Sequence, residues 1–163
     1  MIKKTVLKEL NDQLNRELYA AYLYLGMASK CTEMNRLGYA HWLKEQAEEE
    51  IEHAMKFYNY IHDQCEVVEL AAVDKPALKG KTLLDFFKQA HEHEKLVTDY
   101  INKIMDLSIK EKDYATQVFL QWFITEQIEE EAQTEAIVEA LQVCGDDAAA
   151  LYLLGKHLAK RED

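Results

Sequence analysis

The strongest constraint on the fold is a periodicity: apolar residues recur at alternating spacings of three and four along four long stretches of the chain. Such spacing places a set of side chains on one face of an α-helix. Turn residues are scarce, because the 163 residues include only 5 Gly and 1 Pro. An all-β fold needs many more of them. The sequence therefore predicts a chain that is nearly all α-helical.

The few breaks between the periodic stretches divide the chain into five predicted helices. Their expected ranges are about 4–31, 39–64, 83–109, 114–144 and 147–159. Thr82 and Asp146 are the predicted N-caps of the third and fifth helices, since their side-chain oxygens can accept hydrogen bonds from the first free amide groups. Gly145 is predicted to end the fourth helix, because glycine tolerates the backbone conformation that stops a helix.

The lengths of the joins predict how the helices are arranged. The joins near residues 35–38 and 110–113 are short, which makes each pair of flanking helices an antiparallel hairpin. Residues 66–81 lack a helical pattern and, when extended, can run the length of a helix of about 27 residues, which is about 40 Å. The predicted fold class is all-α: a single domain over residues 1–163, with a four-helix bundle over about 4–144, one long crossover and a short fifth C-terminal helix.

Glutamate interrupts the middle of every predicted core stripe. The four stripes read Leu10, Leu14, Glu17, Ala21, Tyr24, Ala28; Leu43, Ala47, Glu50, Ala54, Phe57, Ile61; Leu83, Phe87, Ala90, Glu94, Val97, Ile101, Ile104; and Phe119, Phe123, Glu126, Glu130, Ile137, Leu141. Burying an unpaired carboxylate is costly, and a bound divalent or trivalent cation neutralises several carboxylates at once. Raised pKa values are an alternative. A register shifted by one residue would expose these glutamates, but all four helices would have to shift.

A Glu-x-x-His motif on the second helix indicates which kind of cation binds to these carboxylates. Glu50 and His53 are three residues apart, so both can ligate one metal ion. Alone, this motif is a weak signal, but the glutamates of the other three helices make it strong. Carboxylate oxygens with one imidazole suit iron, manganese or zinc better than calcium. Five such groups exceed the needs of one ordinary zinc ion and suit a carboxylate-bridged metal pair.

Charge and cysteine content exclude several classes of partner. The formal net charge is −11, which disfavours nucleic acid and anionic membranes and is compatible with cationic metals. No apolar run is long enough to span a bilayer, and the N-terminus lacks the apolar region of a signal peptide. The three cysteines are odd in number and lack a C-x-x-C pair. We therefore expect a cytoplasmic protein that binds neither nucleic acid nor membrane.

These residues resemble the ferritins, and specifically the bacterial non-haem ferritins, over essentially the whole chain. The matching segments are NRELYAAYLYL around Glu17, EQAEEEIEH around Glu50 and His53, HEHEKL around Glu94, and LQWFITEQIEEE around Glu126 to Glu130. The resemblance implies a ferritin-like four-helix bundle and a homo-oligomeric shell of 24 subunits. It further implies an iron storage protein with ferroxidase activity, which oxidises Fe²⁺ with O₂ or H₂O₂ and stores ferric oxyhydroxide in the cavity.

The resemblance also implies roles for individual residues. One iron would be held by Glu17 and His53, and the second by Glu94 and Glu130, with Glu50 bridging them and Gln127 adjacent. A third iron would use Glu49, Glu126 and Glu129 and share Glu130. Tyr24 is expected to act as an electron donor or a hydrogen-bond partner of the ligands, or else to be a buried tyrosine with a satisfied hydroxyl group.

Differences from related di-iron families make this prediction more specific. Many di-iron bundles carry a second Glu-x-x-His on the fourth helix, but here that segment reads Gln127–Ile128–Glu129–Glu130. Bacterioferritin holds haem through a methionine next to the helix-two glutamate, and Ile51 stands there in this chain, so no haem is expected. Two rival functions remain: a di-iron oxidase or peroxidase that retains its metals and stores no iron, and a structural or signalling bundle without metal.

The remaining aromatic and histidine residues carry weaker expectations. His41, His62, His93 and His157 are expected at the surface, and His91 is not expected to be a ligand although it precedes Glu94 by three residues. Trp122 is expected to pack in or near the core. Tyr39, Trp42 and Tyr58 are candidates for a subunit interface, and the apolar fifth helix would pack either around a symmetry axis of the shell or on its own bundle.

Overall fold

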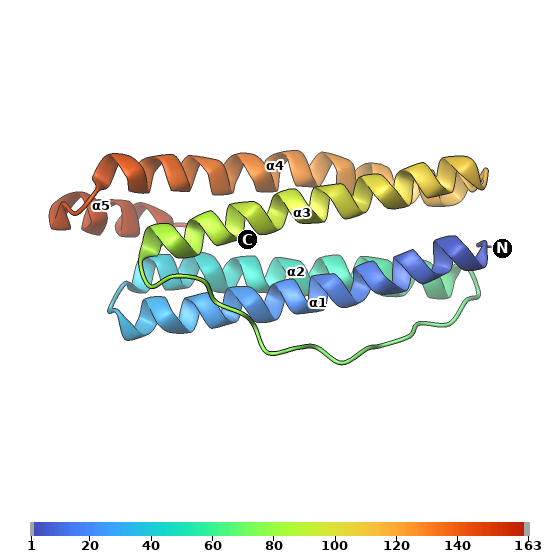
Figure 1. Ribbon diagram of the computed structural model, residues 1–163, viewed down its shortest axis with the longest axis horizontal. Coiled ribbons are helices and arrows are strands. Elements are labelled where there is room, and N and C mark those ends of the chain that lie inside the picture. Colours follow the sequence, from blue (N-terminus) through green and yellow to red (C-terminus); the bar gives the residue numbers. More distant parts are fainter. Residues whose placement is uncertain (1, 162–163) are drawn as a thin grey trace.

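Four long helices form a bundle that a short fifth helix closes at one end. The computed structural model describes residues 2–161, which contain no strand. The helices are α1 (Lys4–Glu33), α2 (Leu37–Asp63), α3 (Leu83–Lys110), α4 (Tyr114–Cys144) and α5 (Ala148–Leu158). In Figure 1, α1 and α2 lie side by side along one side of the bundle, and α3 and α4 lie along the other. The predicted all-α bundle with one crossover is confirmed, although α2 begins at Leu37 rather than Tyr39.

Both hairpins turn through one residue with a positive φ. Asn35 has φ 56° in the join between α1 and α2, and Lys112 has φ 56° in the join between α3 and α4. Such joins keep consecutive helices antiparallel and in contact. Thr82 caps α3 as predicted: its hydroxyl oxygen accepts from the Asp85 amide at 3.1 Å, and the Asp85 carboxylate accepts from the Thr82 amide at 2.9 Å.

The crossover, residues 64–82, runs the length of the bundle beside α1 (Figure 1). Side-chain amides supply the hydrogen bonds that its extended backbone cannot make internally. Asn11 Oδ1 accepts from the Glu69 amide at 2.7 Å, and Asn15 Oδ1 accepts from the Ala71 amide at 2.7 Å. Farther along, Gln89 Nε2 donates to the Ala77 carbonyl at 2.7 Å. The crossover is therefore fixed to the bundle without secondary structure of its own.

The core consists of two apolar clusters. Cluster 1 lies near α5 and includes Leu23, Met27, Leu43, Phe87 and Leu141. Cluster 2 lies toward the join between α3 and α4 and includes Leu10, Leu14, Phe57, Ile101 and Phe123. Every predicted stripe residue of α1, α2 and α3 is buried. On α4 the prediction needs a correction: Glu126 and Phe119 are only half-buried, and Gln127 and Thr134 lie in the core instead.

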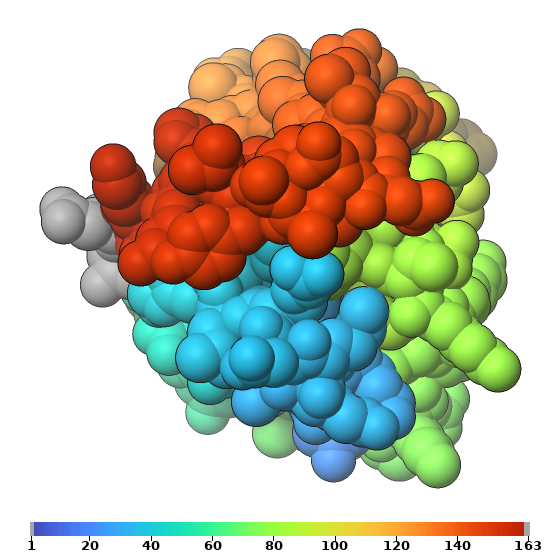
Figure 2. Space-filling view, turned by 90° about the vertical axis from the view of Figure 1, so that its left-hand side faces the viewer, coloured from blue at the N-terminus to red at the C-terminus, as the bar shows by residue number. Residues whose placement is uncertain are grey.

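Helix α5 packs on its own chain, across the end of the bundle (Figure 2). The predicted cap Asp146 is wrong, because the neighbouring Asp147 accepts the amides of Ala149 and Ala150 at 2.8 and 2.9 Å. Gly145 ends α4 with φ 53°, as predicted. A Cβ atom at Gly38 would lie 1.9 Å from the Gly155 carbonyl oxygen, so the close approach of α2 and α5 requires glycine there.

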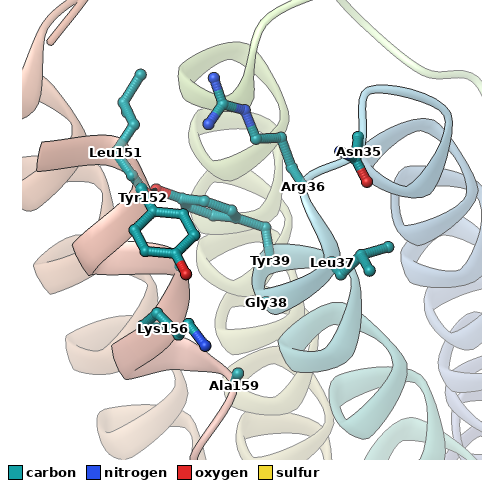
Figure 3. Close-up of a pocket in the computed structure, with 10 residues that line it drawn as sticks. Asn35, Arg36, Leu37, Gly38, Tyr39, Leu151, Tyr152, Lys156 and Ala159 are labelled. Carbon is teal, nitrogen blue, oxygen red and sulfur yellow. Dashed lines mark hydrogen bonds between the residues drawn. The ribbon is translucent and has the colours of Figure 1, made fainter. Parts of the chain in front are cut away.

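A groove lies between the start of α2 and α5, and its lining includes Tyr39 and Tyr152 (Figure 3). Tyr39 reaches across this junction, and its hydroxyl donates to the Leu151 carbonyl at 2.7 Å. Tyr39 and Trp42 belong to cluster 1 and are buried, so they are not surface residues of the chain as their suggested interface role required. Tyr152 and Leu153 of α5 are 59% and 67% exposed, and these are the better candidates for contacts with other subunits. No helix in the described part of the chain combines the length and hydrophobicity needed to cross a bilayer.

Candidate metal centre

The two apolar clusters are separated by a layer of buried polar side chains contributed by all four long helices. We call Glu17, Glu50, His53, Glu94, Gln127 and Glu130 the polar layer; each is at most 4% exposed. The four core glutamates come one from each helix, as the stripes predicted. Each lies on the same helix face as the apolar residues around it, so folding the clusters necessarily buries the carboxylates.

Two groups of potential ligands meet at His53. Glu17, Glu50 and His53 each offer one ligand atom within 4.8 Å of the others, and so do His53, Glu126 and Glu130. His53 Nδ1 lies 3.4 Å from Glu50 Oε2, and His53 Nε2 lies 3.8 Å from Glu126 Oε1. The imidazole thus stands between two clusters of carboxylate oxygens. Each cluster has the ligand types that a transition-metal cation accepts.

Hydrogen bonds from amide and phenol groups orient the carboxylates of the polar layer. Tyr24 donates its hydroxyl proton to Glu94, whose other oxygen accepts from Gln127 Nε2 at 3.2 Å. Glu130 Oε2 accepts from Gln46 Nε2 at 2.7 Å, and the same amide lies 3.3 Å from Glu50 Oε1. Partners of this kind hold ligands in the orientation that a metal ion requires.

Sequence reasoning missed two of these amides, Gln13 and Gln46. Gln13 Nε2 donates to Glu17 Oε1 at 2.8 Å, and Gln46 bonds Glu50 and Glu130. Both glutamines are fully buried. A signal was available, because each stands four residues before a core glutamate and therefore on the same helix face. The distinction between a solvated glutamine and an orienting one was not visible in the spacing alone.

Burial dominates the electrostatics of the polar layer. It raises the pKa of Glu94 to about 7 and, together with the charges of Glu94 and Glu49, raises that of Glu130 to about 8. Burial and neighbouring carboxylates also raise the pKa values of Glu17 and Glu50 well above their usual range. Each carboxylate therefore resists ionisation beside the others. A bound cation would reverse this balance by stabilising the ionised forms.

The residues expected at a third metal position are only partly brought together. Glu126 and Glu130 each offer a ligand atom near His53. Glu129 is exposed, and its carboxylate accepts from Gln133 Nε2 at 3.0 Å. Glu49 forms an ion pair with Arg161 near the end of the chain. The structure thus assembles half of the expected third site.

The aromatic and histidine neighbours of the layer have definite places. Tyr24 is fully buried, and Trp122 is 39% exposed with its ring edge-on to His53 at 5.4 Å between centroids. His91 hydrogen-bonds Thr134 at 3.1 Å, and it belongs to neither ligand group. The surface position expected for His93 is wrong: its Nε2 atom is enclosed without a hydrogen-bond partner among the described residues, and burial lowers its pKa to about 4.

Comparison with known proteins finds similarity along almost the whole chain. The Ferritin family, described as a ferritin-like domain, matches residues 7–143. Relatives named bacterial non-heme ferritin include that of Staphylococcus aureus strain MRSA252, 40% identical over 161 residues, which are 99% of this chain and 97% of the relative. That of Campylobacter jejuni is 40% identical over 158 residues, or 97% of this chain and 95% of the relative. An open-pore ferritin from Archaeoglobus fulgidus has a TM-score of 0.98 at 40% identity, covering 99% of this chain and 100% of that chain.

Proposed function

The chain belongs to the ferritin family, whose general function is iron oxidation and storage, and on this premise we propose that it oxidises Fe²⁺ at a dinuclear site in the polar layer. The observation that carries the proposal is the burial of four carboxylates and one imidazole, one or more from each helix, between two apolar clusters. Such a layer is costly without a cation and favourable with two. Its donor set suits iron.

The proposal assigns a role to each residue of the site. One iron is assigned to Glu17 and His53, the other to Glu94 and Glu130, and Glu50 bridges the two. Glu50 suits the bridge because it lies beside His53 and because the charges of Glu94 and Glu130 both raise its pKa. Gln127 orients Glu94, and Tyr24 donates to the same carboxylate, which is one of the two roles expected of it.

The proposed reaction takes one electron from each of two Fe²⁺ ions. The pair of electrons reduces O₂ to the level of peroxide, or H₂O₂ to water, and the iron leaves as Fe³⁺. The protein supplies ligands, charge and geometry, and the iron supplies the redox chemistry. Glu126 lies beside His53 and Glu130 at the edge of the layer. A third iron position at Glu49, Glu126, Glu129 and Glu130 requires Glu129 to leave Gln133 and Glu49 to leave Arg161.

The proposal extends to the assembly and its setting. We place the chain in a homo-oligomeric shell of 24 subunits, supported by its ferritin neighbours and by the exposed apolar residues of α5. It works without haem, since Ile51 stands where bacterioferritin has its methionine. The cysteines are all free, which fits the cytoplasm. The ferric product is stored as oxyhydroxide in the cavity, and the family does not favour the rival that retains its metals.

Aerobic titration of the metal-free protein with Fe²⁺ tests this proposal. After oxidation, particles are separated by size and their iron is counted. A two-metal site alone would hold about two ions per chain. Storage predicts a large particle that retains far more Fe³⁺ than that. Glu50→Gln should lose rapid oxidation, whereas Glu52→Gln, an exposed neighbour on α2, should keep it. Iron that stops at about two per chain on a small oligomer contradicts storage.

A further inference from the structure

The side chain of Arg161, in the segment that follows α5, contacts Trp42, Gln46 and Glu49 of α2. Its guanidinium forms an ion pair with Glu49 and donates to Gln46 Oε1 at 2.9 Å. It also donates to the Trp42 carbonyl at 3.4 Å and stacks over the Trp42 ring with 4.5 Å from Cζ to the centroid. The side chain is only 13% exposed. An arginine with three hydrogen-bond partners and an aromatic face is held in a built site.

Arg161 connects to the proposed iron ligands through Gln46. The oxygen of this amide accepts from Arg161, and its nitrogen donates to Glu130 at 2.7 Å and lies 3.3 Å from Glu50. Turning the amide over would set its NH₂ group against the guanidinium and its oxygen against the carboxylates. The contact with the guanidinium would be repulsive, because guanidinium only donates hydrogen bonds. Arg161 therefore fixes the orientation in which Gln46 holds both glutamates.

Arg161 also occupies the cation position at Glu49. The negative charge of this carboxylate is one of those that raise the pKa of Glu130. Glu49 is only partly exposed, at 37%, and its ion pair with a nearly buried guanidinium is charge-assisted and hydrogen-bonded. A metal ion that used Glu49 as a ligand would have to displace a positive charge that is already there.

We propose that Arg161 is a tethered cation that holds Glu49 and Gln46 in the unloaded site and is displaced when a third metal ion binds. The inference rests on the proposed function, because it concerns the third iron position of that site. Arg161 is a positioning residue that acts through Gln46 and Glu49. It competes directly with the third ion alone, and it reaches the ligands of the first two ions only through Gln46.

The alternative is that Arg161 only anchors the end of the chain. Its backbone carbonyl lies 3.0 Å from His41 Nε2, which gives the same segment a second attachment to α2. A mere anchor would affect stability and leave the binding of metal ions unchanged. The two roles are therefore separable by measuring metal affinity rather than folding.

Anaerobic calorimetric titration with Fe²⁺ on the assembled, metal-free protein is the first test. Arg161→Gln should bind the third Fe²⁺ per chain about tenfold more tightly, which corresponds to about 1.4 kcal/mol. Its effect on the first two ions comes only from the looser hold of Gln46 on Glu50 and Glu130, so their binding should be weakened, and by less than about tenfold. Arg161→Lys keeps the charge without the planar guanidinium, and its affinity for the third ion should lie between those of wild type and Arg161→Gln. Lys160→Gln, an exposed neighbour with the same change of charge, is the matched control and should match wild type.

Equal third-ion affinity in Arg161→Gln and wild type would overturn the proposal and leave Arg161 as an anchor. Absence of any tightly bound pair of Fe²⁺ in wild type would instead overturn the proposed function. The two failures are thus distinguishable in one set of titrations.

Trp42 fluorescence gives a second readout that an anchor would not move. In a Trp122→Phe background Trp42 is the only tryptophan, and Zn²⁺ serves as a probe without redox chemistry. Departure of the guanidinium from the ring should shift Trp42 emission at the third equivalent of Zn²⁺ and not before. In Arg161→Gln the emission should start in its shifted form and stay there. This readout needs only the background variant if Arg161→Gln does not fold, and a Trp42 emission that never changes overturns the proposal.

Discussion

The apolar clusters and the polar layer between them are built from the same four helices but rest on opposite physical principles. In clusters 1 and 2, side chains such as Leu10 and Leu43 are fully buried and gain free energy simply by leaving water. In the polar layer, equally buried carboxylates lose free energy on leaving water and depend on directional bonds from Gln46, Gln127 and Tyr24. The clusters therefore stabilise the fold, and the layer uses part of that stability to keep a cation site in shape.

The largest effect should come from truncating the clusters. Leu10→Ala and Leu43→Ala should each lower the free energy of unfolding by about 2–5 kcal/mol, because each leaves a cavity in a fully buried site. Denaturant midpoints of the metal-free protein at one fixed concentration measure the loss. The number of Fe²⁺ ions bound per chain should stay the same. Lost stoichiometry in a folded variant would show that the clusters and the layer are not separable.

Replacing a carboxylate of the polar layer should weaken metal binding without lowering stability, the opposite of truncating a cluster. Glu50→Gln should weaken the binding of the Fe²⁺ pair by at least about 100-fold, the upper range seen when even an outer partner of a metal ligand is removed. Stability of the metal-free protein should be unchanged or higher, because a buried ionisable group has become neutral. Anaerobic Fe²⁺ titration and denaturant unfolding measure the two effects, with Glu52→Gln as the exposed control. A large loss of stability would contradict the comparison.

The next largest effect should be a dependence of the metal-free protein's stability on pH, which arises from the polar layer and not from the apolar clusters. Burial raises the pKa values of Glu94 to about 7 and Glu130 to about 8, above their usual 4.5. The unfolded chain then loses these protons at lower pH than the folded chain. Their contribution to stability is therefore fully present below about pH 4.5 and is lost as the pH rises to about 8.

Unfolding midpoints at pH 5.5 and 8 should show the metal-free protein more stable at the lower value. Adding Zn²⁺ should reverse the trend, because binding requires deprotonated carboxylates and releases their protons. Glu130→Gln should flatten the dependence in the metal-free protein. A profile that is flat between these pH values in wild type would mean that the layer is solvated rather than dry.

The smallest effect should come from an amide that orients a carboxylate without contacting metal. Gln127→Leu removes the donor to Glu94 and should weaken Fe²⁺ binding by about tenfold, at the low end of the range for such partners. Stability should change little, since a buried polar group is replaced by an apolar one of similar size. Gln142→Leu, at an exposed position of the same helix, is the control. Equal binding by both variants would show that Glu94 needs no support from Gln127.

Local periodicity made most of the fold and the central residues predictable. Glu17, Glu50 and Glu94 were correctly predicted to be buried because each occupies a position at which the apolar spacing requires a core residue. Reasoning failed where neighbouring candidates compete. Asp147 rather than Asp146 caps α5, and on α4 Gln127 rather than Glu126 is buried in the core of the bundle. One residue corresponds to a rotation of about 100° around a helix, and the pattern of α4 did not fix its rotation that closely.

Local sequence patterns were enough to predict the helices, the stripes and a core carboxylate on each of the four long helices, because these features depend on residues three or four positions apart. Contacts between residues far apart in the chain became visible only in the folded structure. It joins Gln46 to Glu130 and brings Arg161 to Glu49 across separations of 84 and 112 residues. Such contacts depend on how each helix is rotated and where α5 returns the chain. No local spacing encodes those positions, since they follow from the packing of all the helices together.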